Sequence, residues 1–288
     1  MGRASKNSGW RTLRRPTFSM LLLLVTSPLW AQADEWRQDL PTDQRVPGGV
    51  AVMPLAAADA PKPALRFNDH DVLVVSRDGL WYAVVGLPLE LRAGDQQVDL
   101  NGAFLLLELA NKQYPSSTIT VTNAATVRPS EAQQQRIARE NAELMAALNP
   151  VTKRQPEVLA MQPPVAGRFT SVFGKRRYYN GQREPKIHTG LDIAAATGTP
   201  VAAPSAGSVA LVANRFLTGN TVVLDHGSGM FSMYCHLDST AVIAGDELTT
   251  GQLLGKVGAT GRVTGPHLHW SVWLNGSWVE PGLFLAEQ

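Results

Sequence analysis

Cysteine is almost absent from this sequence. Cys235 is the single thiol in 288 residues, which excludes a disulfide within the chain and a zinc site closed by several thiolates. Any metal centre would therefore have to use nitrogen and oxygen ligands. The chain is long enough to bury a substantial core and to form two modest domains, so its stability is expected to come from packing.

A long apolar run is also missing. The N-terminal run "FSMLLLLVTSPLWAQA" contains Pro28 and is shorter than the roughly 20 apolar residues that a spanning helix needs. Five basic residues precede it, and Ala31-Gln32-Ala33 ends it, which is the pattern of a secretory signal peptide. We predict that residues 1–33 are a signal peptide cleaved after Ala33, which leaves no membrane span. A retained anchor is the competing interpretation.

No strong excess of one charge remains after this segment is removed. The full chain has a formal net charge of +2, and the remaining residues carry 21 basic and 24 acidic groups, a formal charge of −3. Charge therefore gives no argument for a nucleic-acid partner.

Residues 34–126 are predicted to form a small β domain. The stretch "DVLVVSRDGLWYAVVGLPLEL" has two β-branched, apolar runs around a Ser-Arg-Asp-Gly turn, and "FLLLELA" and "STITVTN" follow after polar breaks. A sandwich or barrel of short strands is expected. His70 lies in the polar sequence "NDHD" and is expected to be solvated rather than to take part in chemistry. The domain is therefore expected to be a binding, positioning or gating module.

Residues 127–163 are predicted to be a helical linker. Ser130 and Gln133 form a capping-box signature, and "EAQQQRIARENAELMAAL" is rich in helix formers until Asn149-Pro150. Its apolar stripe is narrow, so the helix is expected to pack on one side only. The four prolines of "NPVTKRQPEVLAMQPPV" then predict an extended connection.

Residues 164–288 are predicted to be an antiparallel β domain. Short apolar segments such as "GSVALVAN", "NTVVLDHGSG" and "HLHWSVWLNG" alternate with Gly, Pro, Asn and Asp, and no long helical period interrupts them. The fold class is thus mainly β: a small N-terminal β domain, a helical linker and a C-terminal antiparallel sheet.

Five polar side chains in this last region form a constellation. His267 and His269 are one residue apart and point to the same face of a strand. His188 and Asp192 are separated by a Gly-containing turn that can bring them together, and His236 ends another predicted strand.

The combination is more informative than its parts. A catalytic zinc uses three protein ligands and keeps one position open for water, and His188, Asp192 and one histidine of the pair supply such a set. The other two histidines could then accept or donate protons and stabilise an oxyanion. A purely structural zinc site would normally be closed by four ligands and would favour cysteine.

These motifs resemble those of peptidase family M23, the lysostaphin-type zinc metallopeptidases. The resemblance runs from about Gly167 to Phe284 through "FGKRRYYNGQREPKIHTGLDIAAATGTPVAAPSAGSV", "NTVVLDHGSGMFSMYCHL" and "GATGRVTGPHLHW". It implies that His188, Asp192 and His269 bind Zn²⁺ and that His267 and His236 are catalytic, His267 as general base and His236 as oxyanion stabiliser or proton donor. No position of the pattern is missing. The upstream β region is similar, more loosely, to the N-terminal domain of some exported members.

The resemblance implies an exported zinc endopeptidase that hydrolyses peptidoglycan stem peptides. For a signal peptide with this domain pairing, it implies a periplasmic or secreted enzyme of a Gram-negative bacterium, acting on D-alanyl to diaminopimelate cross-links. The alternative is a non-catalytic wall-binding activator of a peptidoglycan amidase. Whether the N-terminal part holds the enzyme latent, and whether a regulatory protein binds it, stay open.

Other residues have structural interpretations. Strand alternation in "FSMYCH" places Ser232, Tyr234 and His236 on one face and turns Cys235 toward the core. His226 is expected to be structural or solvated. Three glycines flank the motifs, where turns with positive φ or close approach of the substrate backbone would exclude a Cβ. A basic cluster ahead of the first motif forms either a positive rim or a solvated loop. These residues are Gly190, Gly261 and Gly265, and Lys175, Arg176, Arg177, Arg183 and Lys186.

Overall fold

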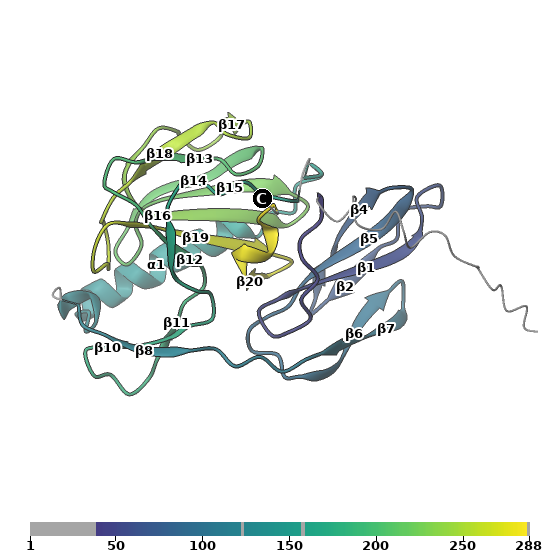
Figure 1. Cartoon of the computed structure of the whole chain (residues 1–288), viewed down its shortest axis with the longest axis horizontal. Helices are drawn as coiled ribbons and strands as arrows, with labels where there is room; N and C mark the ends of the chain where they lie inside the picture. The colour runs from purple at the N-terminus through teal and green to yellow at the C-terminus, as the bar shows by residue number, and fades with distance from the viewer. Residues whose placement is uncertain (1–38, 122–123, 157–158, 287–288) are drawn as a thin grey trace, which may run out of the picture. The chain divides into compact units, whose positions relative to one another are not determined.

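The computed structural model of the chain describes residues 39–121, 124–156 and 159–286 (Figure 1). The predicted signal peptide lies outside these residues. The described part is mainly β, with one α-helix and a large antiparallel sheet, as the sequence predicted. Among the helices of the described residues, none has the length and apolarity that crossing a membrane requires.

The N-terminal strands form two small sheets around a common core. One sheet has the order β1-β5-β4 and the other β3-β2-β6-β7, and apolar side chains from both, such as Val85 and Leu107, share one cluster. This agrees with the expected sandwich of short strands. The strands are β1 (Val50–Ala57), β2 (Leu65–Phe67), β3 (His70–Asp71), β4 (Leu73–Arg77), β5 (Leu80–Gly86), β6 (Gly94–Leu100) and β7 (Ala103–Leu109).

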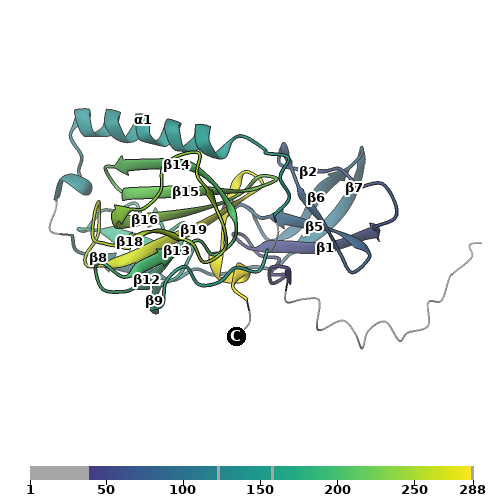
Figure 2. The same cartoon turned by 90° about the horizontal axis from the view of Figure 1, so that it is seen from above.

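The linker helix α1 (Glu131–Leu148) begins with the predicted capping box. The Ser130 side chain accepts a hydrogen bond from the backbone of Gln133, and the Gln133 side chain accepts one from the backbone of Ser130. Leu144 and Leu148 are buried, whereas Met145 is exposed. The helix therefore packs on one side, against β14 (Gly207–Arg215) of the large sheet, as Figure 2 shows.

The C-terminal region is built on one large antiparallel sheet. Its main path has the order β17-β14-β15-β16-β19-β12-β9, with β13, β18 and β20 paired beside it. Its strands are β9 (Arg168–Ser171), β12 (Leu191–Ala194), β13 (Pro200–Ala202), β14 (Gly207–Arg215), β15 (Gly219–Gly227), β16 (Met230–Thr240), β17 (Glu247–Leu248), β18 (Leu253–Val257), β19 (His267–Leu274) and β20 (Ser277–Val279).

A fourth sheet, of three strands, lies beside the large one. The predicted strand near "STITVTN" forms as β8 (Ser116–Ile119), but it pairs in parallel with β10 (Arg176–Tyr179) rather than with the N-terminal strands. The strand β11 (Lys186–Ile187) completes this sheet on the other side of β10. The short 3-10 helices η2 (Ala124–Thr126) and η3 (Pro281–Phe284) are the remaining elements.

The two faces of the large sheet differ in what covers them. Tyr234 and Trp270, fully buried, belong to the main core, which also takes in Val50 and Val84 of the N-terminal strands. The opposite face carries Met233, which packs in a second cluster with the buried leucines of α1. His269 lies on this second face, because strand register places its neighbours there.

Candidate metal centre

Strand register brings three possible metal ligands together. Asp192 on β12 stands directly opposite His269 on β19, and facing residues of an antiparallel pair share one side of the sheet. His188 lies in the turn just before β12, four residues before Asp192, so the chain returns its imidazole to the same point. All three side chains are buried.

The three side chains converge to hydrogen-bonding distance. His188 Nε2 lies 2.9 Å from Asp192 Oδ1 and 2.9 Å from His269 Nδ1, and His269 Nδ1 lies 3.0 Å from Asp192 Oδ1. These are the side chains that, among the described residues, form a group able to hold a metal ion.

The positions of the ring protons on His188 and His269 indicate whether the site can bind a cation. Burial lowers the pKa of His188 to about 4, so this ring is neutral near pH 7, and its Nδ1–H donates to the carbonyl of Val172 at 2.8 Å. His188 Nε2 is then a bare lone pair. His269 Nε2 lies 2.8 Å from Ser271 Oγ, and when Nε2–H donates to this hydroxyl, Nδ1 is bare as well. Two lone pairs and the Asp192 carboxylate face one another, and a cation between them removes their repulsion.

A second pair of histidines lies beside this group. His267 Nε2 is 3.7 Å from Asp192 Oδ1, and its Nδ1–H donates to the carbonyl of Gly265 at 2.9 Å. The ring of His236 lies 4.8 Å from that of His267 between centroids, and its Nδ1–H donates to the carbonyl of Thr260 at 2.8 Å. Both rings are therefore held by the backbone and turn Nε2 toward the centre.

A β-bulge directs His236 to this side of the sheet. Tyr234 pairs with Val222 and Leu237 pairs with Asn220, so β16 has one more residue than β15 between these pairs. His236 occupies the bulge with φ of +62°, in the left-handed region that non-glycine residues rarely adopt.

The expectation that Ser232, Tyr234 and His236 share one face is therefore wrong for His236. The bulge reverses the alternation at that residue, so His236 joins the face of Met233 and Cys235. The other half of the expectation is confirmed, because Cys235 is fully buried in the core cluster with Met233, and burial raises the pKa of its thiol to about 12.

Solved structures and family models agree with this architecture. The model described as "Peptidase family M23" matches residues 186–281, and "Peptidase family M23 N-terminal domain" matches residues 43–109. A solved structure from Pseudomonas aeruginosa assigned to peptidase M23 is 36% identical, covers 87% of this chain and 98% of its own, and superposes with a TM-score of 0.71. The chain belongs to peptidase family M23.

Curated relatives match the M23 domain over a shorter span. A protein of Neisseria gonorrhoeae named "DD-carboxypeptidase/endopeptidase Mpg" is 37% identical over 121 residues, which are 42% of this chain and 28% of that protein. "Peptidoglycan DD-endopeptidase ShyA" of Vibrio cholerae is 38% identical over 109 residues, which are 38% of this chain and 25% of that protein. The matched span is about a quarter of the length of these relatives.

The donor set fits the zinc ion of M23 peptidases. Zinc takes imidazole nitrogens and carboxylate oxygens in tetrahedral sites, and three protein ligands leave a fourth position open. The carboxylate is ionised: burial by itself would raise the pKa of Asp192, but the His188 and His269 imidazoles beside it hold this pKa below its ordinary value.

Arg177 is the main contact of this M23 site that the sequence did not single out. Its guanidinium forms a close ion pair with Asp192 Oδ2 and donates to Ser171 Oγ at 2.8 Å. The sequence suggested only that several basic residues form either a positive rim or a solvated loop. A strand such as "RRYY" gives no sign of which arginine will turn inward, because that choice depends on the pairing of β10 with β8.

The glycines that flank the M23 motifs differ in whether, and why, the backbone requires glycine at their positions. A Cβ at Gly190 would lie 2.5 Å from the Trp270 carbonyl and 2.7 Å from His269 Cε1, so close approach requires glycine there. Gly261 has φ of +79°. Gly265 has neither a positive φ nor a protein atom within 4 Å of an added Cβ, so the protein itself does not require glycine there.

His226 has the structural role that was expected. It is buried, and its ring nitrogens lie 2.8 Å from the Ala206 carbonyl and 2.7 Å from Ser232 Oγ. Because Ser232 also contacts Tyr234 Oη at 2.6 Å, this cluster is satisfied within the core and has no free position for a ligand.

Two hollows reach the M23 centre. One, of about 460 Å³, is lined by Asp192 and His267 and lies next to β8. The other, of about 160 Å³, is lined by His188, His236 and His269. Arg177 and Arg262 line both hollows, so positive charge lies on the path to the centre.

Proposed function

We propose that this protein is an exported zinc endopeptidase that hydrolyses peptide cross-links of bacterial peptidoglycan. The observation that carries the proposal is the convergence of His188, Asp192 and His269 within 3.0 Å of one another beside the His236 and His267 rings. A wall-binding activator of an amidase would have no use for five polar side chains aimed at one point.

His188, Asp192 and His269 would hold the zinc ion. When bound, zinc supplies Lewis-acid chemistry, because it polarises a carbonyl and makes water more acidic. The protein's own part is to fix the ligands in advance: the Val172 carbonyl and Ser271 orient the two imidazoles from behind, as outer contacts of metal-binding histidines do.

His267 is assigned as general base. With Nδ1–H held by the Gly265 carbonyl, Nε2 faces the centre as acceptor for the proton of the attacking water and can return that proton to the leaving amine. His236 is assigned to the oxyanion. Burial, together with the neighbouring His267 and His269 imidazoles, lowers its pKa well below the ordinary value, so it gains a proton on Nε2 only when negative charge develops beside it.

The cross-links are proposed to be those between D-alanine and diaminopimelate. The Neisseria relative is named a DD-carboxypeptidase/endopeptidase and the Vibrio relative a peptidoglycan DD-endopeptidase. Stem peptides carry free carboxylates, and Lys175, Arg177 and Arg262 line the hollow beside Asp192 and His267, so opposite charges favour their approach.

The proposed location is the periplasm of a Gram-negative bacterium. It follows from the predicted signal peptide and from the substrate, because peptidoglycan lies outside the cytoplasm. Fractionation of cells that express the full chain checks the location: mature protein in the periplasmic fraction supports it, and uncleaved protein in the cytoplasm contradicts it.

Digestion of isolated sacculi tests the activity. Purified protein is incubated with sacculi with and without chelator, next to a His267→Ala variant, and the products are identified by mass spectrometry. Loss of cross-linked muropeptides with a new diaminopimelate amine, abolished by chelator and by the substitution, is the expected result. Intact cross-links with zinc-loaded protein would contradict the proposal, and stimulation of an added amidase instead would favour the activator.

A further inference from the structure

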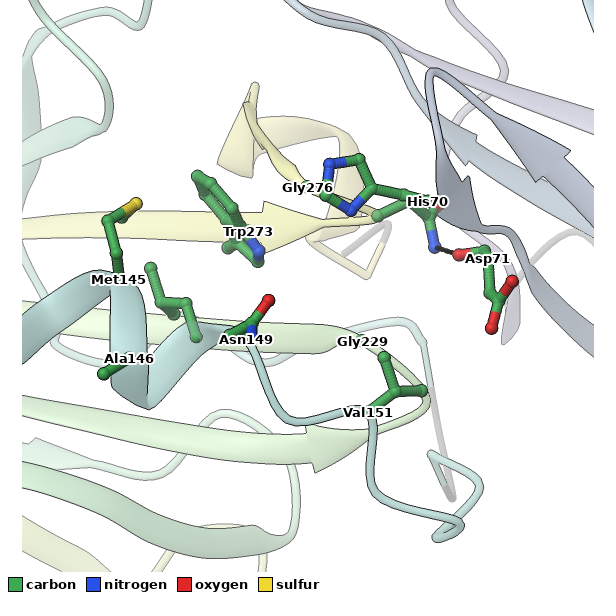
Figure 3. Close-up of a pocket in the computed structure, with 11 residues that line it drawn as sticks. His70, Asp71, Met145, Ala146, Asn149, Val151, Gly229, Trp273 and Gly276 are labelled. Carbon is green, nitrogen blue, oxygen red and sulfur yellow. Dashed lines mark hydrogen bonds between the residues drawn. The ribbon is translucent and has the colours of Figure 1, made fainter.

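A hollow of about 480 Å³ lies away from the metal centre, at the meeting of the N-terminal strands with α1 and the β19-β20 hairpin. Figure 3 shows its lining, with His70 entering from the N-terminal side, Met145 and Asn149 from α1 and its end, and Trp273 between them. Its volume is within the range of roughly 300–1,000 Å³ that small-molecule sites occupy. Nothing in the proposed chemistry uses these residues.

This hollow is joined to the metal centre by a row of shared lining residues. Trp273 and Gly276 line both the hollow and a neighbouring one of about 200 Å³. Ile187 and Thr189 line that neighbour and also the hollow that contains His188, His236 and His269. The three hollows thus follow one another along one side of the large sheet.

The spacing along this row follows from β19 itself. His269 and Trp273 are four residues apart on the same strand, so they lie on the same face, roughly 13 Å apart along it. Register supports this, since Cys235 faces His269 and Phe231 faces Trp273 across β16. An extended peptide of about four residues covers the same length.

The chemistry of the lining favours a neutral, hydroxyl-rich ligand. Trp273 and Trp278 stand edge to face with centroids 5.0 Å apart, and both are half-buried, so part of their aromatic surface is open. The side chains of His70 and Asn149 add polar groups. Within the described residues that line the two hollows, none is Lys or Arg, whereas Asp71 and Glu90 are present, which disfavours a phosphate or a carboxylate.

We propose that the hollow at Trp273 is a subsite for a sugar ring of the glycan strand that bears the stem peptide. The inference rests on the proposed function and deepens it. About four amino acids separate the cleaved D-alanyl bond from the sugar, which matches the spacing of His269 and Trp273. The ring would stack on the indole, and the His70 imidazole would hydrogen-bond to its hydroxyl or acetamido groups.

The N-terminal domain thereby gains a role in binding substrate. His70 packs directly over the backbone of Gly276, because a Cβ there would lie 2.3 Å from its ring. The buried Asn275 fixes this arrangement, since its side chain donates to the Asp71 carbonyl at 2.9 Å and accepts from the Gly86 N–H at 3.2 Å.

Binding of peptide-free glycan strands, made by treating sacculi with an amidase, tests the inference without any cleavage. Indole N–H signals of the full-length purified protein are followed by NMR as strands are added. We expect saturable shifts that are roughly tenfold weaker in affinity for Trp273→Leu and His70→Ala. Phe104→Ala removes an exposed aromatic ring outside the hollow and is the control. Absence of shifts, or equal binding by all variants, overturns the subsite.

A kinetic comparison separates this inference from the proposed function. The kcat/KM value is measured for a cross-linked dimer that carries its disaccharides and for the same dimer without sugar. The ratio is expected to favour the sugar-bearing dimer by roughly tenfold, to fall in His70→Ala and Trp273→Leu, and to persist in Phe104→Ala. A ratio of one in the wild type overturns the subsite but leaves the endopeptidase intact, and cleavage of neither dimer overturns the endopeptidase.

Discussion

Single hydrogen bonds decide which nitrogen each histidine presents to the centre. Nδ1–H of His188, His236 and His267 donates to the carbonyl of Val172, Thr260 and Gly265, respectively. Each of these rings therefore presents Nε2. His269 is reversed: Ser271 holds its Nε2, and Nδ1 faces Asp192. The orientation of every ring is thus set by the polypeptide before a metal ion arrives.

Gly190→Ala is expected to displace the ring of His269. The new Cβ would lie 2.6 Å from Ser271 Oγ and 2.7 Å from His269 Cε1, so the contact that orients this ligand cannot survive. Zinc affinity, measured by competition with a chelating dye, should fall roughly tenfold or more. Gly265→Ala, on the other side of the motifs, meets no atom within 4 Å and should retain zinc. Equal affinity in the two variants would contradict this prediction.

His226 should make the fold sensitive to acid. Burial lowers its pKa from 6.5 to about 4, so on acidification the unfolded chain takes up a proton that the folded chain refuses. The stability that His226 contributes is complete above about pH 6.5 and is lost as the pH falls toward 4, by about 3 kcal/mol. The free energy of unfolding of zinc-loaded protein, measured with urea, should differ less between pH 7 and pH 5 for His226→Gln than for the wild type. The same difference between pH 7 and pH 5 in both proteins would contradict this role of His226.

At the scale of elements, the site depends on one irregularity in a regular sheet. A continuous β16 would turn His236 to the face of Tyr234, and the bulge turns it to the face of His269 instead. Bulges commonly redirect side chains at active sites. The periodicity of "MFSMYCHL" contains no sign of it, which is why strand alternation placed His236 on the wrong face.

Replacement of His236 by glycine and by alanine should separate the role of its imidazole in activity from the role of its backbone conformation in the bulge. Both variants lose the imidazole, and both are expected to lose activity on sacculi. Because φ is +62° at this position, His236→Gly should be more stable than His236→Ala by about 1 kcal/mol in urea unfolding. An alanine variant as stable as the glycine variant would indicate that the bulge is not maintained by the surrounding backbone.

Local sequence signals predicted the elements better than their partners. Ser130 and Gln133 marked the start of α1, and His-x-His spacing placed His267 and His269 on one face, because these are short-range properties of the backbone. The pairing of β8 with β10, and with it the inward turn of Arg177 to Asp192, joins residues some 60 positions apart. Such contacts depend on which distant segments of the chain become neighbours in the fold, and the composition of a segment does not contain this information.

At the scale of the whole molecule, the described N-terminal strands and the large sheet share a core. Leu73 and Val84 belong to the same buried cluster as Trp270 and Leu274. A cluster of this kind couples the unfolding of the two regions. The sequence indicated two β regions joined by a linker. It could not indicate this common core, because the apolar pattern of a strand does not show which other strands it packs against.

Asn275→Gly should weaken the connection between these regions. Asn275 is buried with φ of +47°, and glycine keeps this backbone while it leaves the Gly86 N–H and the Asp71 carbonyl unpaired. A loss of about 2 kcal/mol in the free energy of unfolding is expected. Asn68→Gly has the same φ of 47° at an exposed turn and is the matched control. Equal stability of both variants would contradict the role of Asn275.

In the proposed mechanism, one zinc ion held by His188, Asp192 and His269 is required for the cleavage of peptidoglycan cross-links. The most direct measurement is to strip the metal from purified protein and titrate zinc back while following cleavage of a cross-linked muropeptide dimer. Activity is expected to rise from zero and to level off at one zinc per chain. Full activity in stripped protein, or one bound zinc with every cross-link intact, would contradict it.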